Sequence, residues 1–296
     1  MRVWLVISSY RNDDEVVKLI DQAHSSAQGL FERILVVDSQ GTARVPAIIQ
    51  SRGWLDVEYR CFEINLGSGA NLAERLKIAA GSGADYAYAV NHDGHIDAKV
   101  VRALLEVAQG RKKLGAAYPL GFFTDVRRYN LTGTRELPLP AKLVKTAPKE
   151  PTIPVYWSSS NGALYSLEPA REGLLPWDAM WMGWEDLEYG WRLKDHGYEQ
   201  IVVTSAVFPD NQEYSGSAVG NVVRKPSWRT YYGVRNLVLA VKRSRNRPLY
   251  HAVVAFRILL ECGLTLLVRD DKRKRLRFLI SGVRDGYRGI QGMVAF

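Results

Sequence analysis

Two adjacent acids, Glu185 and Asp186, stand in a segment that carries three tryptophans, WMGWEDLEYGWRLKDHG (181–197). A carboxylate beside an aromatic wall suits general-base work on a substrate hydroxyl such as that of a sugar, whose faces stack on aromatic rings. Acids in the first turn of a helix are also stabilised by the helix dipole, which is the competing interpretation. The segment therefore offers a candidate general base, and the surroundings of the two acids must decide between the catalytic interpretation and the helix-dipole interpretation.

A second polar cluster is VNHDGH (90–95), where Asp93 supplies a hard oxygen ligand suited to Mn²⁺ or Mg²⁺ between two phosphates. His92 and His95 open a zinc interpretation, but no further Cys/His cluster accompanies them. In an extended strand Asn91 and Asp93 share one side. A polar turn at a strand end remains the alternative to a metal site.

Two further features suit a nucleotide. Asp38 closes the apolar run ILVVD, and an acid there can accept hydrogen bonds from a ribose or a base edge, or else serve a turn. In NLGSGANLA (65–73), Gly67 and Gly69 allow close backbone approach, and a helix N-terminus behind them favours phosphate. The segment is neither a P-loop nor a dinucleotide fingerprint, so a plain glycine-rich turn explains it equally well.

The first 123 residues alternate between short apolar runs and helical patterns. Strands are expected at 2–9, 33–39, 57–64, 85–94 and 114–123, and helices at 14–28, 43–52, 68–83 and 97–110. This alternation predicts an α/β class with a mostly parallel central sheet and right-handed crossovers. The polar clusters then lie together at the carboxyl ends of the strands, where such sheets bind ligands.

The later residues follow other patterns. Five prolines and no clear period predict a long loop at 124–154. Strand character resumes at 155–167 and 199–208, on either side of a helix that ends at Gly197, and three helices are expected at 228–243, 248–268 and 271–286. We expect a catalytic domain over 1–223 and a helical extension over 224–296.

The net charge of +9 is distributed unevenly. Residues 224–296 contain 17 Lys/Arg and 4 Asp/Glu, a charge of +13, so the remainder carries −4. The functional interpretation is a basic surface that sits on anionic lipid and reaches a lipid-linked acceptor. A helical extension with a solvated basic face is the alternative. No nucleic-acid-binding motif accompanies the charge, so nucleic acid is not an expected partner.

Three features of the sequence bear on the cellular compartment. Cys61 and Cys262 make no disulfide framework, and both are expected to be buried. No signal peptide is visible, and the apolar stretch 252–268 contains Arg257 and Glu261, which makes it a poor membrane span. We expect a cytoplasmic protein, peripheral on the cytoplasmic face of the cell membrane.

Taken together, the motifs resemble the family 2 glycosyltransferases, which have the GT-A fold, a Rossmann-like nucleotide-diphospho-sugar transferase fold. The resemblance covers about 1–210 and rests on the order SSYRND, VVDS, NLGSGANLA, VNHDGH, SSNGALYSL and WEDLEYGWRLKDHGY. The tail YYGVRNLVLAVKR (231–243) is similar to that of the bacterial rhamnosyl- and galactofuranosyltransferase branch, which builds cell-wall or surface glycans.

The resemblance implies an inverting transfer of a sugar from a nucleotide-diphosphate sugar, a UDP- or dTDP-sugar, to a hydroxyl of a glycan or polyprenyl-linked acceptor. It implies that the following residues bind the donor: Ser8, Tyr10, Arg11, Asp38, Asn65, Gly67, Asn71 and Asn91. A nucleotidyltransferase and a non-catalytic sugar-nucleotide-binding protein are the alternatives. The first of these should carry a glycine-rich phosphate loop after the first strand, which SSYRND lacks.

For the chemistry, the resemblance implies that Asp186 is the catalytic base and that Glu185 and Trp184 hold the acceptor. Gly162 would lie in the strand that faces the acceptor. Asp93 would be the metal-binding acid, with His95 as an additional ligand. Two departures concern the metal. Asn91 replaces the first acid of Asp-x-Asp, and VFPDNQ, with Asp210, stands where some relatives place a ligating His.

Overall fold

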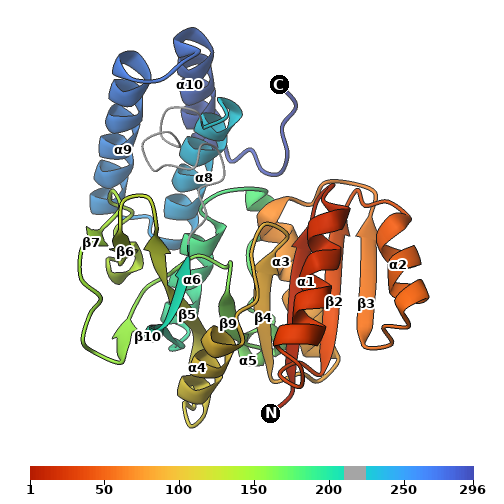
Figure 1. Ribbon diagram of the computed structural model, residues 1–296. Coiled ribbons are helices and arrows are strands. Elements are labelled where there is room, and N and C mark those ends of the chain that lie inside the picture. The colour runs from red at the N-terminus through yellow and green to blue at the C-terminus, as the bar shows by residue number, and fades with distance from the viewer. Residues whose placement is uncertain (210–224) are drawn as a thin grey trace.

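The computed structural model describes residues 1–209 and 225–296. Its centre is a mixed sheet of ten strands with helices on both faces (Figure 1). In spatial order the main path is β3 (Val57–Phe62), β2 (Arg33–Ser39), β1 (Val3–Ser9), β4 (Tyr86–Asn91), β9 (Ala163–Ser166), β5 (Leu114–Phe123), β10 (Glu199–Pro209) and β8 (Thr152–Pro154). The first four strands are parallel, β9 is antiparallel to both of its neighbours, and β5 is parallel to β10. The predicted α/β class with a mostly parallel sheet is confirmed.

The two faces of the sheet are covered by different helices. One face packs against α1 (Asp13–Ser26), α2 (Arg44–Arg52) and α4 (Ala98–Ala108). The other packs against α3 (Gly67–Gly81), the short α5 (Glu168–Arg171) and α6 (Glu185–Asp195). Along β1, Leu5 belongs to the first core cluster and Val6 to the second. Because both faces are covered, the strand is apolar throughout and does not alternate with polar residues.

Two expectations about the middle of the chain need correction. The 124–154 loop contains β6 (Arg128–Asn130), a 3-10 turn at Thr132–Thr134, β7 (Leu143–Val144) and β8. These elements are too short to show a period, and pairing with β5 and β10 creates them. Conversely, the strand expected over 155–167 is reduced to β9, and the backbone of Tyr156 and Trp157 packs against Gly190 of α6 instead.

The C-terminal helices are α8 (Trp228–Ser244), α9 (Pro248–Leu267) and α10 (Lys272–Arg288), which stand together above the sheet (Figure 1). The inner helix is α8, which shares a core cluster with α6. Part of the basic charge pairs with acids of the sheet domain. Arg245 bonds both Glu136 and Asp195, and Arg243 lies 3.5 Å from Glu188.

Helix α9 is apolar and only partly covered. It is long and apolar enough to cross a membrane by length and composition alone, with mean hydropathy 1.5 and 22% of its apolar window buried. Leu259, Leu260 and Leu267 are among its exposed residues. The cysteine expectation was wrong at Cys61, which is exposed, and Cys262 is only half-buried.

Candidate active site

The acid pair lies at the start of α6, where the chain makes a sharp turn. Gly183 and Trp184 have φ values of +89° and +68°, so the backbone enters the helix through two left-handed residues. Asp186 borders a cavity of about 120 Å³ that it shares with Trp157 and with polar groups from two segments. These polar groups belong to Asn130, Thr132, Ser158 and Ser159. A carboxylate therefore meets an aromatic wall and several hydroxyls in one hollow.

The electrostatics of Asp186 differ from those of a helix-capping acid. Burial is the main cause that raises its pKa, to about 8, and the neighbouring charge of Glu185 adds to this shift. Hydrogen-bonding groups of Ser160 and the positive charge of Arg75 act in the opposite direction. Its Oδ1 is buried and has no hydrogen-bond partner among the described residues. Perturbed acids of this kind are concentrated at functional sites.

Arg75 was missed in the sequence. Its side chain is 2% exposed, and its Nη1 donates to the carbonyls of Val6 in β1 (2.9 Å) and Val90 in β4 (3.3 Å). Burial lowers its pKa to about 10. The sequence did contain a sign of this role, because Arg75 stands on the apolar face of α3, three residues after Leu72, where an arginine is unusual.

Glu185 is tied to the glycine-rich segment. Its Oε1 accepts a short hydrogen bond from the Ser68 hydroxyl, and burial raises its pKa. At Gly67 (φ +73°) an added Cβ would lie 2.1 Å from the Trp181 carbonyl oxygen. Gly69 donates its backbone N–H to the same carbonyl at 3.3 Å. Gly67 and Gly69 therefore make room for the backbone of Trp181, which precedes α6.

The residues expected at the donor site surround the ends of β1, β2 and β4. Asp38 is fully buried, which raises its pKa, and it accepts a hydrogen bond from the Tyr59 hydroxyl at 3.0 Å. Ser8 donates to Asn91 Oδ1 at 3.0 Å, which joins β1 to β4. Asn71 Nδ2 donates to the Val37 carbonyl at 2.9 Å. Of these four side chains, Asp38 and Asn71 are buried, and Ser8 and Asn91 are half-buried.

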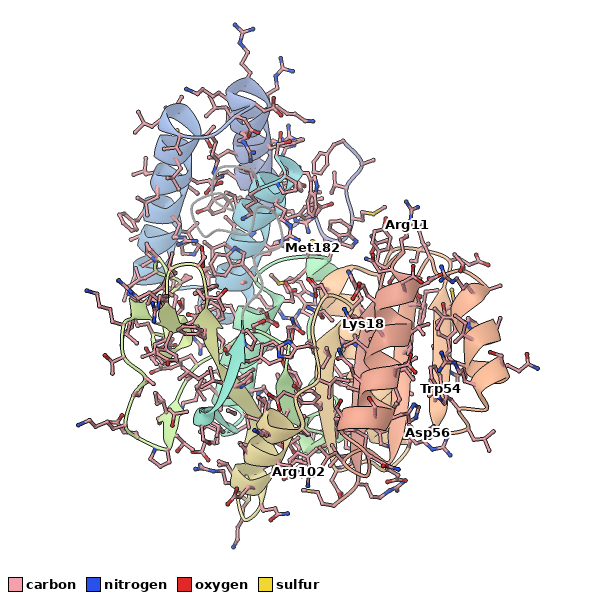
Figure 2. All side chains as sticks on the ribbon, in the orientation of Figure 1. Arg11, Lys18, Trp54, Asp56, Arg102 and Met182 are labelled. Atoms are coloured by element: carbon pink, nitrogen blue, oxygen red, sulfur yellow. The ribbon has the colours of Figure 1, made fainter. Side chains whose placement is uncertain are left out.

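Tyr10 and Arg11 continue from the end of β1 into the loop before α1. Arg11 has a φ of +55°, and its guanidinium lies 5.2 Å from the Tyr10 ring centroid. It donates to Gln40 Oε1 at 3.1 Å. Figure 2 shows Arg11 at the same end of the sheet as Met182. Asn65 lies at the α3 entry, where its Oδ1 accepts the Gly67 N–H and its carbonyl accepts Trp181 Nε1.

Asp93, the acid expected to bind a divalent cation, is exposed just after β4, whereas Asn91 Oδ1 already accepts the Ser8 hydrogen bond. The His95 ring stacks on Phe208 with a centroid distance of 4.3 Å. In residues 1–209 and 225–296 no group of three His, Cys, Asp or Glu side chains is placed to hold a metal ion. Asp210, the other suggested ligand, lies outside the described residues.

Gly162 and Trp184 occupy different surroundings. Gly162 (φ +81°) precedes β9, and an added Cβ would lie 3.1 Å from the Phe208 ring. Trp184 turns toward the C-terminal helices, where its Nε1 donates to the Gly233 carbonyl at 2.7 Å. It meets the cavity beside Asp186 through the edge of Trp157, with a ring separation of 6.2 Å.

A second contribution that sequence reasoning missed comes from Asn236 on α8. Its Nδ2 donates to the carbonyls of Met180 (2.6 Å), Met182 (2.8 Å) and Gly183 (2.9 Å). Arg235 donates to the Met180 carbonyl as well. The dipeptide Arg-Asn within YYGVRN was the signal, and its role is to fix the turn that precedes the acid pair.

No family model and no curated protein sequence matches the chain. Solved structures do match it. TarS 1–349 from S. aureus is 12% identical with a TM-score of 0.61, over 97% of this chain and 81% of that one, and it has also been solved with UDP-GlcNAc. The mannosyltransferase PcManGT from Pyrobaculum calidifontis, in complex with GDP-Man and Mn²⁺, is 13% identical (TM-score 0.57; 97% and 87%). GalNAc-T7 with UDP, GalNAc and Mn²⁺ is 12% identical (TM-score 0.62; 98% and 56%). The chain has the GT-A glycosyltransferase fold.

Proposed function

On this fold, we propose that the chain is an inverting glycosyltransferase that moves a sugar from a nucleotide-diphosphate sugar to an acceptor hydroxyl. The observation that carries the proposal is Asp186. Its partnerless Oδ1 is buried beside a cavity with an aromatic wall, in the crevice where an open α/β sheet binds ligands. A nucleotide-sugar donor is supported by the complexes of structural neighbours with UDP-GlcNAc and GDP-Man.

The residues divide the work as follows. Asp186, when ionised, takes the proton of the acceptor hydroxyl, whose oxygen attacks the anomeric carbon from the face opposite the leaving diphosphate. The bond to the diphosphate breaks as the new glycosidic bond forms, so a single displacement inverts the configuration. Trp157 provides a ring on which the acceptor sugar can stack. Asp38 and Ser8 lie where they can hold the nucleoside.

A divalent cation fits this site only as one shared with the donor. Mg²⁺ is commonly held by one or two carboxylates together with substrate phosphates, and Asp93 is a single exposed carboxylate at the right strand end. The ion would neutralise charge on the diphosphate. Two of the neighbours were solved with Mn²⁺, which is consistent with this assignment.

The acceptor and location remain proposals. Exposed Leu266, Leu267 and Val268 end α9, and the exposed bases Lys272, Arg273 and Lys274 follow them at the start of α10. Apolar residues bordered by basic ones suit the surface of an anionic membrane. We therefore propose a peripheral protein of the cytoplasmic face that extends a glycan or polyprenyl-linked acceptor for the cell wall or cell surface.

The test is a panel of UDP-, dTDP- and GDP-sugars, with donor binding and donor hydrolysis measured with Mn²⁺, with Mg²⁺ and with EDTA. One donor should be bound and slowly hydrolysed, and Asp93→Ala should weaken its metal-dependent binding by about tenfold. Lys99→Ala, an exposed residue on α4, is the control.

The same panel separates the alternatives. Binding of a donor without hydrolysis, and without transfer to any glycan offered, would favour a non-catalytic binding protein. Release of diphosphate from a nucleoside triphosphate and a sugar phosphate would favour a nucleotidyltransferase. Donor affinity that is the same with Asp93→Ala and with EDTA would remove the metal from the proposal.

A further inference from the structure

The hollow beside Asp186 has one wall that comes from the segment before β9. The residues of this acceptor wall, Trp157, Ser158 and Ser159, line the cavity together with Asp186 of α6. In the proposed reaction an acceptor sugar lies against the wall while its hydroxyl is within hydrogen-bond reach of Asp186. The separation between the acceptor wall and α6 therefore determines where an acceptor can bind.

One buried side chain joins the chain before the acceptor wall to α6. Gln200 lies on β10 and is 1% exposed. Its Nε2 donates to the carbonyl of Tyr156 at 3.0 Å and to the carbonyl of Gly190 in α6 at 2.7 Å. Its Oε1 accepts a hydrogen bond from the Tyr118 hydroxyl of β5 at 3.0 Å. Gln200 thus uses both Nε2 hydrogens and its oxygen to connect the wall, the helix and the sheet.

The contact between the acceptor wall and α6 leaves no spare room. Gly190 follows Asp186 by about one helical turn. A Cβ added at Gly190 would overlap the Tyr156 carbonyl oxygen and would lie 2.8 Å from Trp157 Cβ. Because Gly190 lies inside a helix, its backbone conformation is one that any residue adopts. Glycine is therefore required at this position for space, and the wall packs directly on the helix that carries Asp186.

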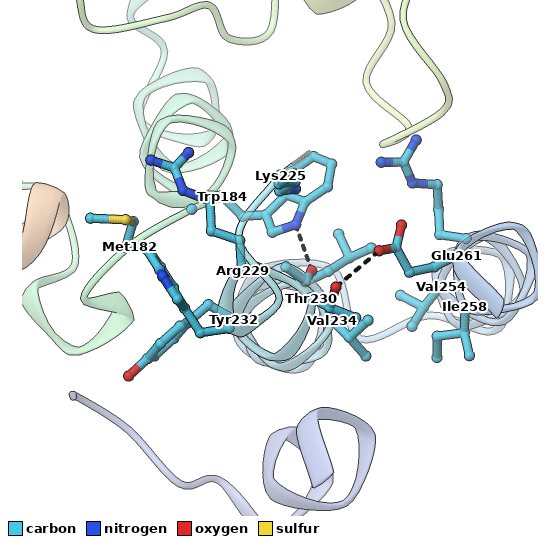
Figure 3. Close-up of a pocket in the computed structure, with 15 residues that line it drawn as sticks. Met182, Trp184, Lys225, Arg229, Thr230, Tyr232, Val234, Val254, Ile258 and Glu261 are labelled. Carbon is cyan, nitrogen blue, oxygen red and sulfur yellow. Dashed lines mark hydrogen bonds between the residues drawn. The ribbon is translucent and has the colours of Figure 1, made fainter. Parts of the chain in front are cut away.

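Other contacts hold the acceptor wall on its remaining sides. The Tyr156 N–H donates to the Gly133 carbonyl at 2.8 Å, and a Cβ added at Gly133 would overlap the Trp157 carbonyl. The Trp157 ring meets the edge of Trp184. Trp184 in turn donates to the Gly233 carbonyl of α8, beside a second cavity (Figure 3). The wall is thus fixed against α6 at one point and against α8 at another.

A purely stabilising role is the competing explanation of these contacts. A buried amide that satisfies two carbonyls stabilises the fold wherever it occurs. The bonds of Gln200, however, converge on the residue that precedes the acceptor wall and on the helical turn that follows Asp186. Water can reach the base without a wall, whereas a sugar hydroxyl needs one for its orientation. The two roles therefore predict different effects on transfer and on donor hydrolysis.

We propose that Gln200 is a positioning residue that sets the distance between the acceptor wall and Asp186, so that the sugar passes to an acceptor hydroxyl rather than to water. This inference rests on the proposed transferase function. Gln200 acts through Tyr156 and Gly190 and does not touch the reacting atoms. A displacement of about 1 Å between reacting groups can cost about 10²-fold in rate, so a small movement of the wall is sufficient.

The first test pushes the acceptor wall from the α6 side and leaves Gln200 in place. Gly190→Ala puts a methyl group against the Tyr156 carbonyl, although alanine favours the helix itself. With the donor that the panel identifies, transfer is measured to the methyl glycosides of glucose, galactose, mannose and rhamnose. The kcat/KM for the acceptor should fall by about 10- to 100-fold, while donor hydrolysis stays as in the wild type. Gly263→Ala in α9 is the matched control, because no described atom lies within 4 Å of its added Cβ.

The second test changes Gln200 itself. Gln200→Met removes all three hydrogen bonds and should separate transfer from hydrolysis in the same way. Gln200→Glu keeps the shape and, when protonated, one donor, so it should lose less transfer. Val101→Ala, in the core under α4, controls for lost stability and should change transfer and hydrolysis equally. Hydrogen exchange needs no substrate, and residues 155–160 should exchange faster in Gln200→Met while α4 exchanges as in the wild type.

Two results would overturn the proposal. An equal loss of transfer and hydrolysis in Gly190→Ala and Gln200→Met would show that these contacts only stabilise the fold. Wild-type transfer by a folded Gln200→Met would show that Gln200 does not position the wall, and if this variant does not fold, Gly190→Ala carries the same test. Faster exchange at 155–160 without any sugar transfer by the wild type would instead sink the transferase function and leave the hold of Gln200 on the wall intact.

Discussion

The two sides of the Met182–Trp184 turn hold charges of opposite sign under similar conditions. On one side, Glu185 and Asp186 are desolvated, and burial raises the pKa of both. On the other side, burial lowers the pKa values of Lys225 and Arg257. The basic side chains are distant from the acid pair in the chain, and they line a cavity together with Met182, Gly183 and Trp184. Arg229 is the link, since its charge lowers the pKa of Glu185.

Burial shifts the two sets in opposite directions, because it disfavours the charged form of an acid and of a base alike. On the acid side, Asp186 Oδ1 is left without a hydrogen-bond partner among the described residues, and the proposed function uses this oxygen as the base. The predictions below begin with the acid side and end with a test of whether the two sides act independently.

The largest effect is expected from Asp186→Asn, which removes the proposed base but keeps the shape of the side chain. Turnover should fall by a factor of about 10²–10⁴, because general-base catalysis contributes a rate factor of this size, while donor binding stays unchanged. Steady-state kinetics measures the turnover, and calorimetry measures donor binding. Wild-type turnover in this variant would show that Asp186 is not the base.

Asp186→Asn should also make the folded protein more stable than the wild type at high pH. Folding raises the pKa of Asp186 from 3.8 to about 8, so ionisation opposes folding increasingly as pH rises between these values. Asp186→Asn should therefore be more stable than the wild type at pH 8, by about 0.5–2 kcal/mol. Near pH 3 the difference should vanish, because both states are then protonated. Thermal melts at the two pH values are the measurement.

A change in Asn236 should affect both stability and turnover. Asn236→Ala leaves the carbonyls of Met182 and Gly183 without their donor, at a cost of about 1–3 kcal/mol in the free energy of unfolding. Turnover should decline as well, because this turn positions the acid pair. Asn246→Ala, an exposed residue after α8, is the control. A loss of stability with wild-type turnover would show that the turn does not position the acids.

How far the sequence could reach differs between the two sides. The position of the acid pair could be predicted, because Glu185 and Asp186 are adjacent, precede an amphipathic helix and stand beside tryptophans. That Asp38 and Asn91 end parallel strands followed from the apolar runs before them, whereas the roles assigned to these residues stay predictions. The cavity that Lys225 and Arg257 line could not be predicted, since the two residues are 32 residues apart. Only the packing of α9 against α8 brings them together, and no local pattern encodes that contact.

The sequence left one motif open and undervalued another. Gly67 and Gly69 suited either a phosphate-binding turn or a plain glycine-rich turn, and in the structure they admit the Trp181 backbone. That use depends on a loop more than a hundred residues later and leaves no local trace. Arg75 looked like an ordinary helix residue, although it is the cation next to Asp186. Its role depends on which helix face meets the sheet.

The smallest expected effect is on the pH dependence of Glu185→Gln. If Asp186 must be ionised, log(kcat/KM) should rise with pH with a slope of about 1 up to about pH 8 and then level off. The pKa of Asp186 in the free enzyme sets the pH at which this rising limb of the profile ends. Glu185 raises that pKa by its charge, so Glu185→Gln should move the limb to lower pH while the plateau changes little. Arg257→Gln should leave the limb in place, because Arg257 lies across the turn. A limb that moves equally in both variants would mean that one electrostatic unit spans the turn. The acids and the bases would then have to be treated as a single site.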